Sequence, residues 1–237
     1  MSYLNLSKNT LYSLVFIFPM LFMYELFCFV NYYNYSYEIR NSADVFIRTF
    51  FYYFGESSNI IYALTILIVF LIILYRNKEI IILSSIDFKI LLCMLIESLA
   101  WTFIFFILMV SFGNTLIMLI KGNIIVENFY LSIGAGIWEE IVFRLIILSS
   151  TIFIFKNIFN YKFIISVILS IVISSVLFSI FHYIGPFAEE FTYRSFFIRS
   201  FAGILLSILY LFRGLGITVY THIFYDMLII SLPTLHD

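Results

Sequence analysis

The sequence predicts an all-α integral membrane protein, a polytopic bundle of about seven transmembrane helices. Hydrophobic residues make up 63% of its 237 residues and charged residues only 11%, against about 25% in ordinary soluble domains. Several apolar runs reach the roughly 20 residues that a helix needs to cross a hydrocarbon core of about 30 Å. These runs lack the alternation of apolar and polar residues that is typical of membrane β-barrel strands, so helices are the expected way to span the bilayer.

Seven apolar segments are the expected spans. In order, they cover residues 11–30, 58–75, 90–112, 129–155, 163–185, 196–213 and 214–232. Between the first two lies an aromatic stretch, Ala43 to Phe54, that contains Arg48. This pattern is typical of an interfacial helix lying in the plane of the membrane surface.

Charge and cysteine content exclude other classes. The net charge of −1 gives no basic signal for nucleic-acid binding. Cys28 and Cys93 lie inside apolar runs, where a cysteine acts as a small core residue, so we expect neither a disulfide nor a metal pair.

Ionisable side chains within the expected spans are costly, at roughly 2.5–3.5 kcal/mol each or more on insertion scales, and therefore indicate function or pairing. Two isolated carboxylates, Glu25 and Glu97, have no matching partner in their own spans, and we interpret them as structural. Arg199 and Arg213 lie near the two ends of the sixth span. Six further groups lie on the fourth, fifth and seventh spans and are Glu139, Glu140, Arg144, His182, His222 and Asp226.

The spacing of these groups assigns them to helix faces. Residues four apart share a face, so Glu140 can pair with Arg144, and His222 lies on the same face as Asp226. Glu139 lies about 100° around the helix from Glu140 and is free to point elsewhere. If the three helices bring these groups together, they form a polar pocket that can hold water, activate it and stabilise an oxyanion.

Each motif alone has a simpler interpretation. A Glu-Arg pair in a membrane helix is more often structural or part of a transport path, and a histidine at a helix end is usually interfacial. His-x-x-x-Asp is common. The combination is more specific: Glu-Glu-x-x-x-Arg, Phe-x-x-x-His and His-x-x-x-Asp follow one another on three late apolar segments.

In this order the motifs resemble those of the CPBP family, which includes the type II CAAX prenyl endopeptidases and bacterial proteins of bacteriocin processing and immunity. The resemblance covers about residues 129–232 and includes Gly203 and the Arg213-Gly214 step. It implies a catalytic transmembrane core over residues 129–232. The apolar runs before it predict N-terminal transmembrane helices with interfacial segments over residues 1–128, which carry no family motif, and a short tail covers residues 233–237.

The resemblance also implies roles for the residues. Glu139 would activate a water molecule together with His182. Glu140 and Arg144 would set the helix geometry or position the substrate. The i, i+4 spacing leads us separately to expect that Arg144 neutralises Glu140. The last motif, His222 and Asp226, would complete the site by binding the oxyanion or a metal ion.

Two points stay open at this stage. Glu139, His182 and His222 make an acceptable catalytic zinc set, so composition does not decide between a glutamate-dependent and a zinc-dependent enzyme. Asp226 stands where the prenyl-protease branch often has Asn. An ionised Asp accepts hydrogen bonds but cannot donate one to an oxyanion, so Asp226 would instead orient His222, ligate a metal or be protonated.

We therefore expect an intramembrane endopeptidase that cleaves a membrane-associated peptide or protein. It would be a multi-pass protein of the bilayer, in the plasma membrane if the source is prokaryotic, and the sequence names no substrate. The competing hypotheses are a transporter with a proton-relay cluster and a catalytically inactive immunity or scaffold member of the family. The lack of inverted repeats and the order of the three motifs argue against the transporter.

Overall fold

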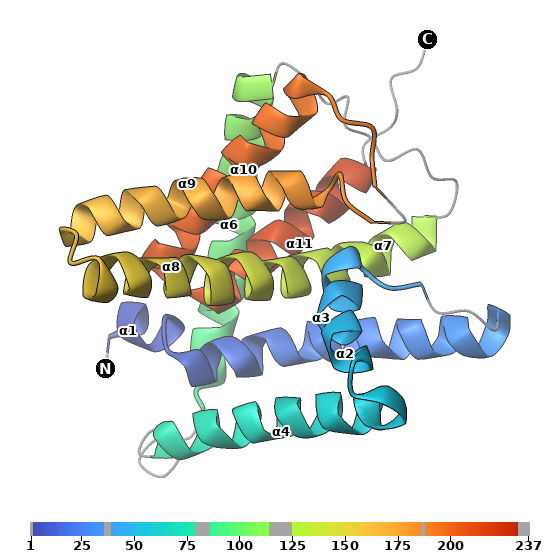
Figure 1. The fold of residues 1–237 in the computed structure, drawn as a ribbon. Coiled ribbons are helices and arrows are strands. Elements are labelled where there is room, and N and C mark those ends of the chain that lie inside the picture. The colour runs from blue at the N-terminus through green and yellow to red at the C-terminus, as the bar shows by residue number, and fades with distance from the viewer. Residues whose placement is uncertain (1, 36–38, 79–85, 114–124, 186–187, 232–237) are drawn as a thin grey trace.

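The computed structural model describes residues 2–35, 39–78, 86–113, 125–185 and 188–231, and over these residues the chain is a helical bundle without strands. Figure 1 shows the order and arrangement of the helices. The N-terminal helices are α1 (Tyr3–Ser7), α2 (Thr10–Tyr35), α3 (Ser42–Tyr52), the short 3₁₀ turn η1 (Gly55–Ser57), α4 (Ser58–Arg76) and α6 (Phe88–Gly113). The C-terminal helices are α7 (Ile125–Gly134), η2 (Ala135–Leu148), α8 (Ser149–Phe153), η3 (Ile154–Ile158), α9 (Phe163–Phe181), α10 (Tyr193–Arg213) and α11 (Leu215–Ser231).

The helices confirm an integral, multi-pass membrane protein. Within the described part of the chain, five helices are long and apolar enough to cross a bilayer. They cover residues 10–33, 88–112, 128–158, 163–181 and 193–213. The other two expected spans are apolar but shorter, Ile60–Arg76 and Leu215–Ser231. The expected interfacial segment is helical as α3, and the tail 233–237 lies outside the described residues.

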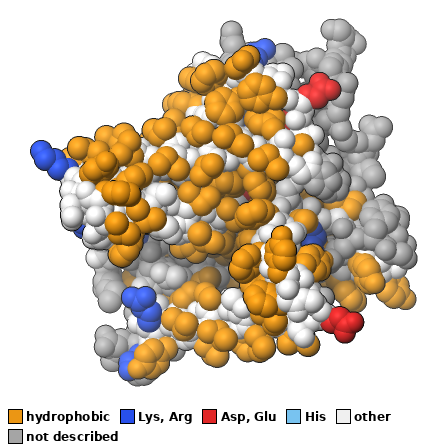
Figure 2. All heavy atoms as spheres, in the orientation of Figure 1, with side chains coloured by type: hydrophobic (Ala, Val, Ile, Leu, Met, Phe, Trp, Pro, Cys, Tyr) orange, Lys and Arg blue, Asp and Glu red, His pale blue; other side chains and the backbone are white. Residues whose placement is uncertain are grey.

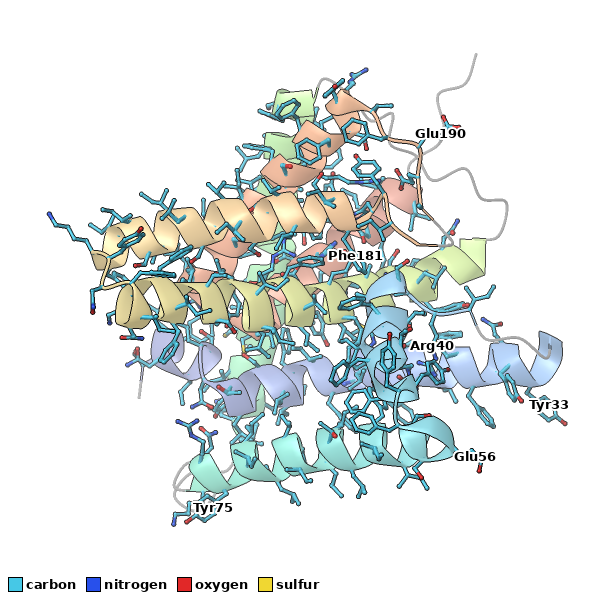
Figure 3. All side chains as sticks on the ribbon, in the orientation of Figure 1. Tyr33, Arg40, Glu56, Tyr75, Phe181 and Glu190 are labelled. Carbon is cyan, nitrogen blue, oxygen red and sulfur yellow. The ribbon has the colours of Figure 1, made fainter. Side chains whose placement is uncertain are left out.

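Much of the surface is apolar, as a lipid-facing bundle requires. Figure 2 shows one face covered largely by hydrophobic side chains, with the charged groups near its edges. Helix α4 is exposed along most of its length, including Ile60, Leu64, Leu67 and Phe70. In Figure 3 the labelled side chains of Tyr33, Glu56, Tyr75 and Glu190 likewise lie at the periphery.

Helix α11 is the centre of the bundle and packs against α2, α6, α7, η2 and α10. Its first nine residues, Leu215 to Ile223, are all buried. Gly136 of η2 lies so close to Ile223 and Val219 of α11 that a Cβ atom there would collide with them. Such close backbone approach at a small residue is typical of helix packing in membranes, where the hydrophobic effect does not drive association.

Helices η2, α9 and α10 are joined by short polar and backbone contacts. Ser174 of α9 donates a hydrogen bond of 2.7 Å to the carbonyl of Phe143 in η2. Gly203 of α10 lies against the backbone of Ser175. These contacts fix the position of α9 relative to the helix that carries the two glutamates.

The two carboxylates without a partner in their own spans are paired across helices, which agrees with a structural role. Glu25 of α2 forms ion pairs with Arg40 (2.9 Å) and with Arg48 of α3 (3.2 Å). Glu97 of α6 forms an ion pair with Arg213 at the end of α10 and accepts a hydrogen bond from Tyr3. Figure 3 places Arg40 where α3 crosses α2.

Candidate active site

The candidate catalytic groups come from three elements that pack against one another. Glu139, Glu140 and Arg144 lie on η2, which is wound as a π-helix, a rare geometry that often occurs at functional sites. His182 follows the last residue of α9 and caps that helix. His222 and Asp226 lie on α11.

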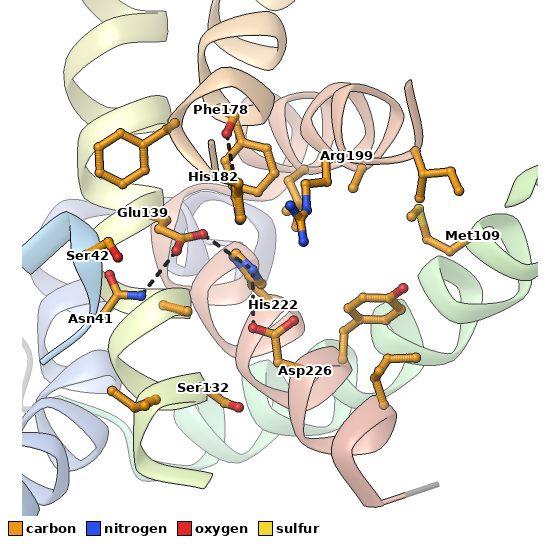
Figure 4. A pocket seen from close by; sticks show the side chains of 18 of the residues that line it. Asn41, Ser42, Met109, Ser132, Glu139, Phe178, His182, Arg199, His222 and Asp226 are labelled. Atoms are coloured by element: carbon orange, nitrogen blue, oxygen red, sulfur yellow. Dashed lines mark hydrogen bonds and ion pairs between the residues drawn. The ribbon is translucent and has the colours of Figure 1, made fainter. Parts of the chain in front are cut away.

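A cavity of about 400 Å³ lies where these elements meet, and Glu139, His182, His222 and Asp226 all line it (Figure 4). Four of the five predicted catalytic side chains therefore share one cavity. Glu139 and His222 are almost fully buried, with exposed fractions of 5% and 6%. The wall opposite is mostly apolar and is formed by residues of α6, α10 and α11, among them Phe105, Met109, Ile198, Leu206 and Ile229.

Glu140, the fifth predicted catalytic residue, is not among the residues that line the cavity. Its side chain is fully buried, and its Oε1 accepts a hydrogen bond of 2.7 Å from Nδ1 of His222. Glu140 also pairs with Arg144, whose Nη1 lies 3.1 Å from the same oxygen. Glu140 therefore contacts His222 on the side of the imidazole ring that faces away from the cavity.

The other ring nitrogen of His222 faces the acidic groups in the cavity. Nε2 lies 4.0 Å from Oε2 of Glu139 and 3.6 Å from Oδ2 of Asp226. Both distances exceed a normal hydrogen bond, so the three groups surround a space instead of closing on one another. Asp226 thus approaches the nitrogen that Glu140 leaves free.

His182 is oriented by its own helix. Its Nδ1 lies 2.9 Å from the carbonyl oxygen of Phe178, one turn earlier. Because a carbonyl oxygen only accepts, Nδ1 carries the hydrogen, and Nε2 of the neutral ring keeps its lone pair. The ring also packs edge-on against that of Phe178, with centroids 5.0 Å apart, and Figure 4 shows it on the same side of the cavity as Glu139.

Arg144 is completely buried between η2, α9 and α10. Besides Glu140, its guanidinium lies 4.5 Å from the ring centroid of Phe178, and Nη2 reaches the carbonyl of Gly203 at 3.5 Å. It does not line the cavity. This placement favours the predicted structural role of Arg144.

Zinc was left open by the sequence, and the geometry gives it no ready site. Among the described residues, no three His, Cys, Asp or Glu side chains are placed to hold one metal ion together. The set Glu139, His182 and His222 shares the cavity but does not converge on a single point.

The sequence analysis did not assign Asn41, Glu189 and Arg199 to the site, although all three line the cavity. Asn41 donates a hydrogen bond of 3.2 Å from Nδ2 to Oε1 of Glu139. Arg199 pairs with Glu189 at 2.7 Å. An Asn directly before an aromatic helix is a recognisable N-cap signal, but no local pattern indicates that this cap reaches the fourth expected span.

Comparison with known proteins gives one family. Residues 121–228 match the family model described as Rce1-like, type II CAAX prenyl endopeptidase. This match confirms the resemblance to the CPBP proteases and covers Glu139, His182, His222 and Asp226. Searches of curated proteins and of solved structures found no match for the chain.

Proposed function

Since residues 121–228 of this chain match the Rce1-like family model, we propose that the protein is an intramembrane endopeptidase that hydrolyses a peptide bond in a membrane-associated peptide or protein. The observation that carries this proposal is the cavity that Glu139, His182, His222 and Asp226 share within the bundle. Grouping such costly side chains around one cavity fits a reaction that needs water at membrane depth.

In this proposal Glu139 and His182 hold the attacking water. One water hydrogen points to Oε2 of Glu139, and the other points to the lone pair on Nε2 of His182, whose Nδ1 is held by Phe178. Glu139 takes the proton as the water oxygen bonds to the carbonyl carbon of the substrate. Glu139 then returns that proton to the amide nitrogen as the C–N bond breaks, which yields a carboxyl end and an amine end.

His222 stabilises the oxyanion in this scheme. Glu140 accepts the hydrogen bond from Nδ1, and a proton on Nε2, flanked by Glu139 and Asp226, can be donated to the developing negative charge. Donors positioned in advance for an oxyanion are usually worth several kcal/mol of barrier. Asp226 then acts by orienting and balancing the charge of His222, a role that an acceptor-only carboxylate can fill.

The apolar wall of the cavity supports a hydrophobic substrate segment, in keeping with the name of the matched family. The first probe is therefore an internally quenched peptide whose fourth residue from the C-terminus is a farnesylated cysteine. The same peptide without the farnesyl group is its comparison. A substrate of the bacteriocin-precursor type stays a prediction and is the next peptide to test.

The test compares the full chain with Glu139→Gln and His182→Ala in detergent or in vesicles. Each substitution is expected to lower kcat by on the order of 10²–10⁴-fold while the melting temperature stays close to that of the parent. Glu56→Gln, at an exposed site outside the cavity, is the matched control and should cleave at the parental rate. Parental cleavage by Glu139→Gln would remove this residue from the mechanism, and a parent that cleaves none of the peptides would favour the inactive scaffold instead.

A further inference from the structure

We infer that Asn41 is a positioning residue for Glu139, an inference that rests on the proposed function. Asn41 lies immediately before α3, far in sequence from residues 121–228, to which the family match is confined. Its amide nitrogen donates to Oε1 of Glu139 at 3.2 Å, and this leaves Oε2 facing His222 and the cavity. Figure 4 shows the Asn41 side chain directed at Glu139 from the N-terminal end of α3.

The same side chain has a second, separable task. Its Oδ1 accepts a hydrogen bond of 2.8 Å from the backbone nitrogen of Ala43, which caps the first turn of α3. Asn, Asp and Ser are about equally good N-caps, but of these only Asn both caps the helix and donates from a side-chain amide. The two tasks can therefore be separated by substitution.

Asn41 is held in place by buried groups of α2 and α3. Its backbone nitrogen donates to the hydroxyl of Tyr24 at 3.0 Å, and that hydroxyl donates to Oδ2 of Asp44 at 3.0 Å. Tyr24 and Asp44 are both fully buried. Asn41 therefore has a fixed backbone position and is not part of a loose loop.

Two arginines complete this frame. Arg40 bridges Asp44 (2.7 Å) and Glu25 (2.9 Å), and Arg48 bridges the same two carboxylates at 2.8 and 3.2 Å. Asp44 is fully buried, and a buried charge is tolerated when it is paired and hydrogen-bonded in this way. These two arginines and two carboxylates hold the start of α3 against α2. They thereby fix the position along η2 at which Asn41 contacts that helix.

A glycine on α7 makes the approach possible. Gly134 lies five residues before Glu139, and a Cβ atom at this position would collide with the ring of Tyr24 and touch Cβ of Asn41. The absence of a side chain there lets the start of α3 lie close to the helix that carries Glu139. The small residue at position 134 permits the close approach, and the hydrogen bond then joins Asn41 to the Glu139 carboxylate.

The physical effect of the contact is to select one orientation of a general base. A buried carboxylate without a donor can rotate, and a misplaced base lowers the rate because the reacting atoms must be aligned closely. With Oε1 held by Asn41, Oε2 is the oxygen presented to the water. Removing the donor should therefore lower kcat and leave substrate binding nearly unchanged.

Three variants of the full chain separate this role from helix capping. Asn41→Asp and Asn41→Ser keep a good cap but remove the donor, and Asp places a second carboxyl group against Glu139. Both should keep KM within about twofold and lower kcat by roughly 10–100-fold, the range for residues that orient a reacting group, and Asn41→Ser should melt a little below the parent because the hydrogen bond to Glu139 is lost. Asn41→Ala should show the same loss of kcat together with a melting temperature below that of Asn41→Ser, because the cap is lost as well.

The farnesylated reporter peptide and its unmodified form are the probes, and Asn157→Asp, at an exposed site outside the cavity, controls for the added charge. Parental kcat in Asn41→Asp and Asn41→Ser would overturn the inference, because capping alone would then explain the residue. A loss confined to KM would overturn it as well, since Asn41 would then contact the substrate.

A second measurement needs no cleavage. Melting temperatures of Asn41→Ser, Glu139→Ala and the double variant form a cycle that reports the coupling between the two side chains. Non-additive changes support the contact, and additive changes overturn it. A parent that cleaves no peptide while the cycle is non-additive would contradict the proposed function and leave the contact standing, so the two failures can be told apart.

Discussion

Nδ1 of His222 lies 2.7 Å from Oε1 of Glu140, and this hydrogen bond joins α11 to η2 behind the cavity. The second glutamate of the Glu-Glu pair thereby contacts the imidazole of His222, while the first lines the cavity. A carboxylate that holds one nitrogen of an imidazole fixes the ring so that the other nitrogen points to the reacting groups. Two adjacent residues of the same type thus have different surroundings because the helix turns by about 100° between them.

The first prediction concerns this hydrogen bond. Glu140→Gln keeps an oxygen that can accept from Nδ1 of His222 but removes the charge that stabilises a proton on the ring. We expect kcat to fall by roughly 10²-fold, as for other residues that orient a catalytic imidazole, with little change in KM. Steady-state kinetics on the reporter peptide measure this effect, and an unchanged kcat would assign Glu140 to the structure alone.

Arg144 is predicted to be structural. Arg144→Ala leaves the buried Glu140 without its cation, and breaking a buried pair in this way typically costs about 3–5 kcal/mol. The variant should therefore show lower expression or a clearly lower melting temperature, together with lower activity. The double variant Glu140→Gln, Arg144→Met should regain much of the stability, because neither charge is then stranded.

The alternative for Arg144 has a distinct signature. If Arg144→Ala inserts and melts like the parent yet loses cleavage, the guanidinium acts on the substrate or the oxyanion. Arg144→Lys is the informative comparison, because lysine keeps the charge but cannot reproduce the planar fork that lies over Phe178 and reaches Gly203.

The ion pair of Glu97 and Arg213 is predicted to stabilise the fold without affecting catalysis. Neither residue lines the cavity, and both are tied to α1, Glu97 through Tyr3 and Arg213 through Ser7. Glu97→Gln should lower the melting temperature and leave kcat and KM of the folded fraction at parental values. Tyr3→Phe removes a single hydrogen bond and should cost about 0.5–1.5 kcal/mol; a loss of kcat in either variant would show that this cluster is coupled to the cavity.

Close packing of η2 against α11 is predicted to be required for activity. Gly136→Ala introduces a Cβ atom that meets Ile223 and the backbone of Val219, so the helices that carry Glu139 and His222 must move apart. Overpacking of this kind typically costs about 1–3 kcal/mol, and kcat should fall as the distance between the catalytic groups grows. Ala63→Val on the exposed face of α4 adds volume where nothing is packed and should be neutral in both thermal melting and cleavage assays.

The sequence alone determined the fold class, most helix positions and most of the candidate site. These features follow from local physics: an apolar run of sufficient length is helical in a bilayer because its backbone groups must be satisfied within the segment. Burying ionisable groups is costly, so Glu139, His182, His222 and Asp226 were recognisable as a set before any contact between them was known. Glu140 was recognised too, although its spacing indicated only the pairing with Arg144.

Tertiary structure decided the contacts between elements distant in sequence. Three sets of contacts depend on how the helices pack. Glu140 accepts a hydrogen bond from His222, Glu25 and Glu97 form ion pairs with arginines outside their own helices, and Asn41 donates a hydrogen bond to Glu139. Periodicity assigns a residue to a face of its own helix but not to the neighbour that this face meets. The crossing of α3 over α2 and the close approach at Gly134 set that neighbour, and this packing turns an N-cap asparagine into part of a candidate active site.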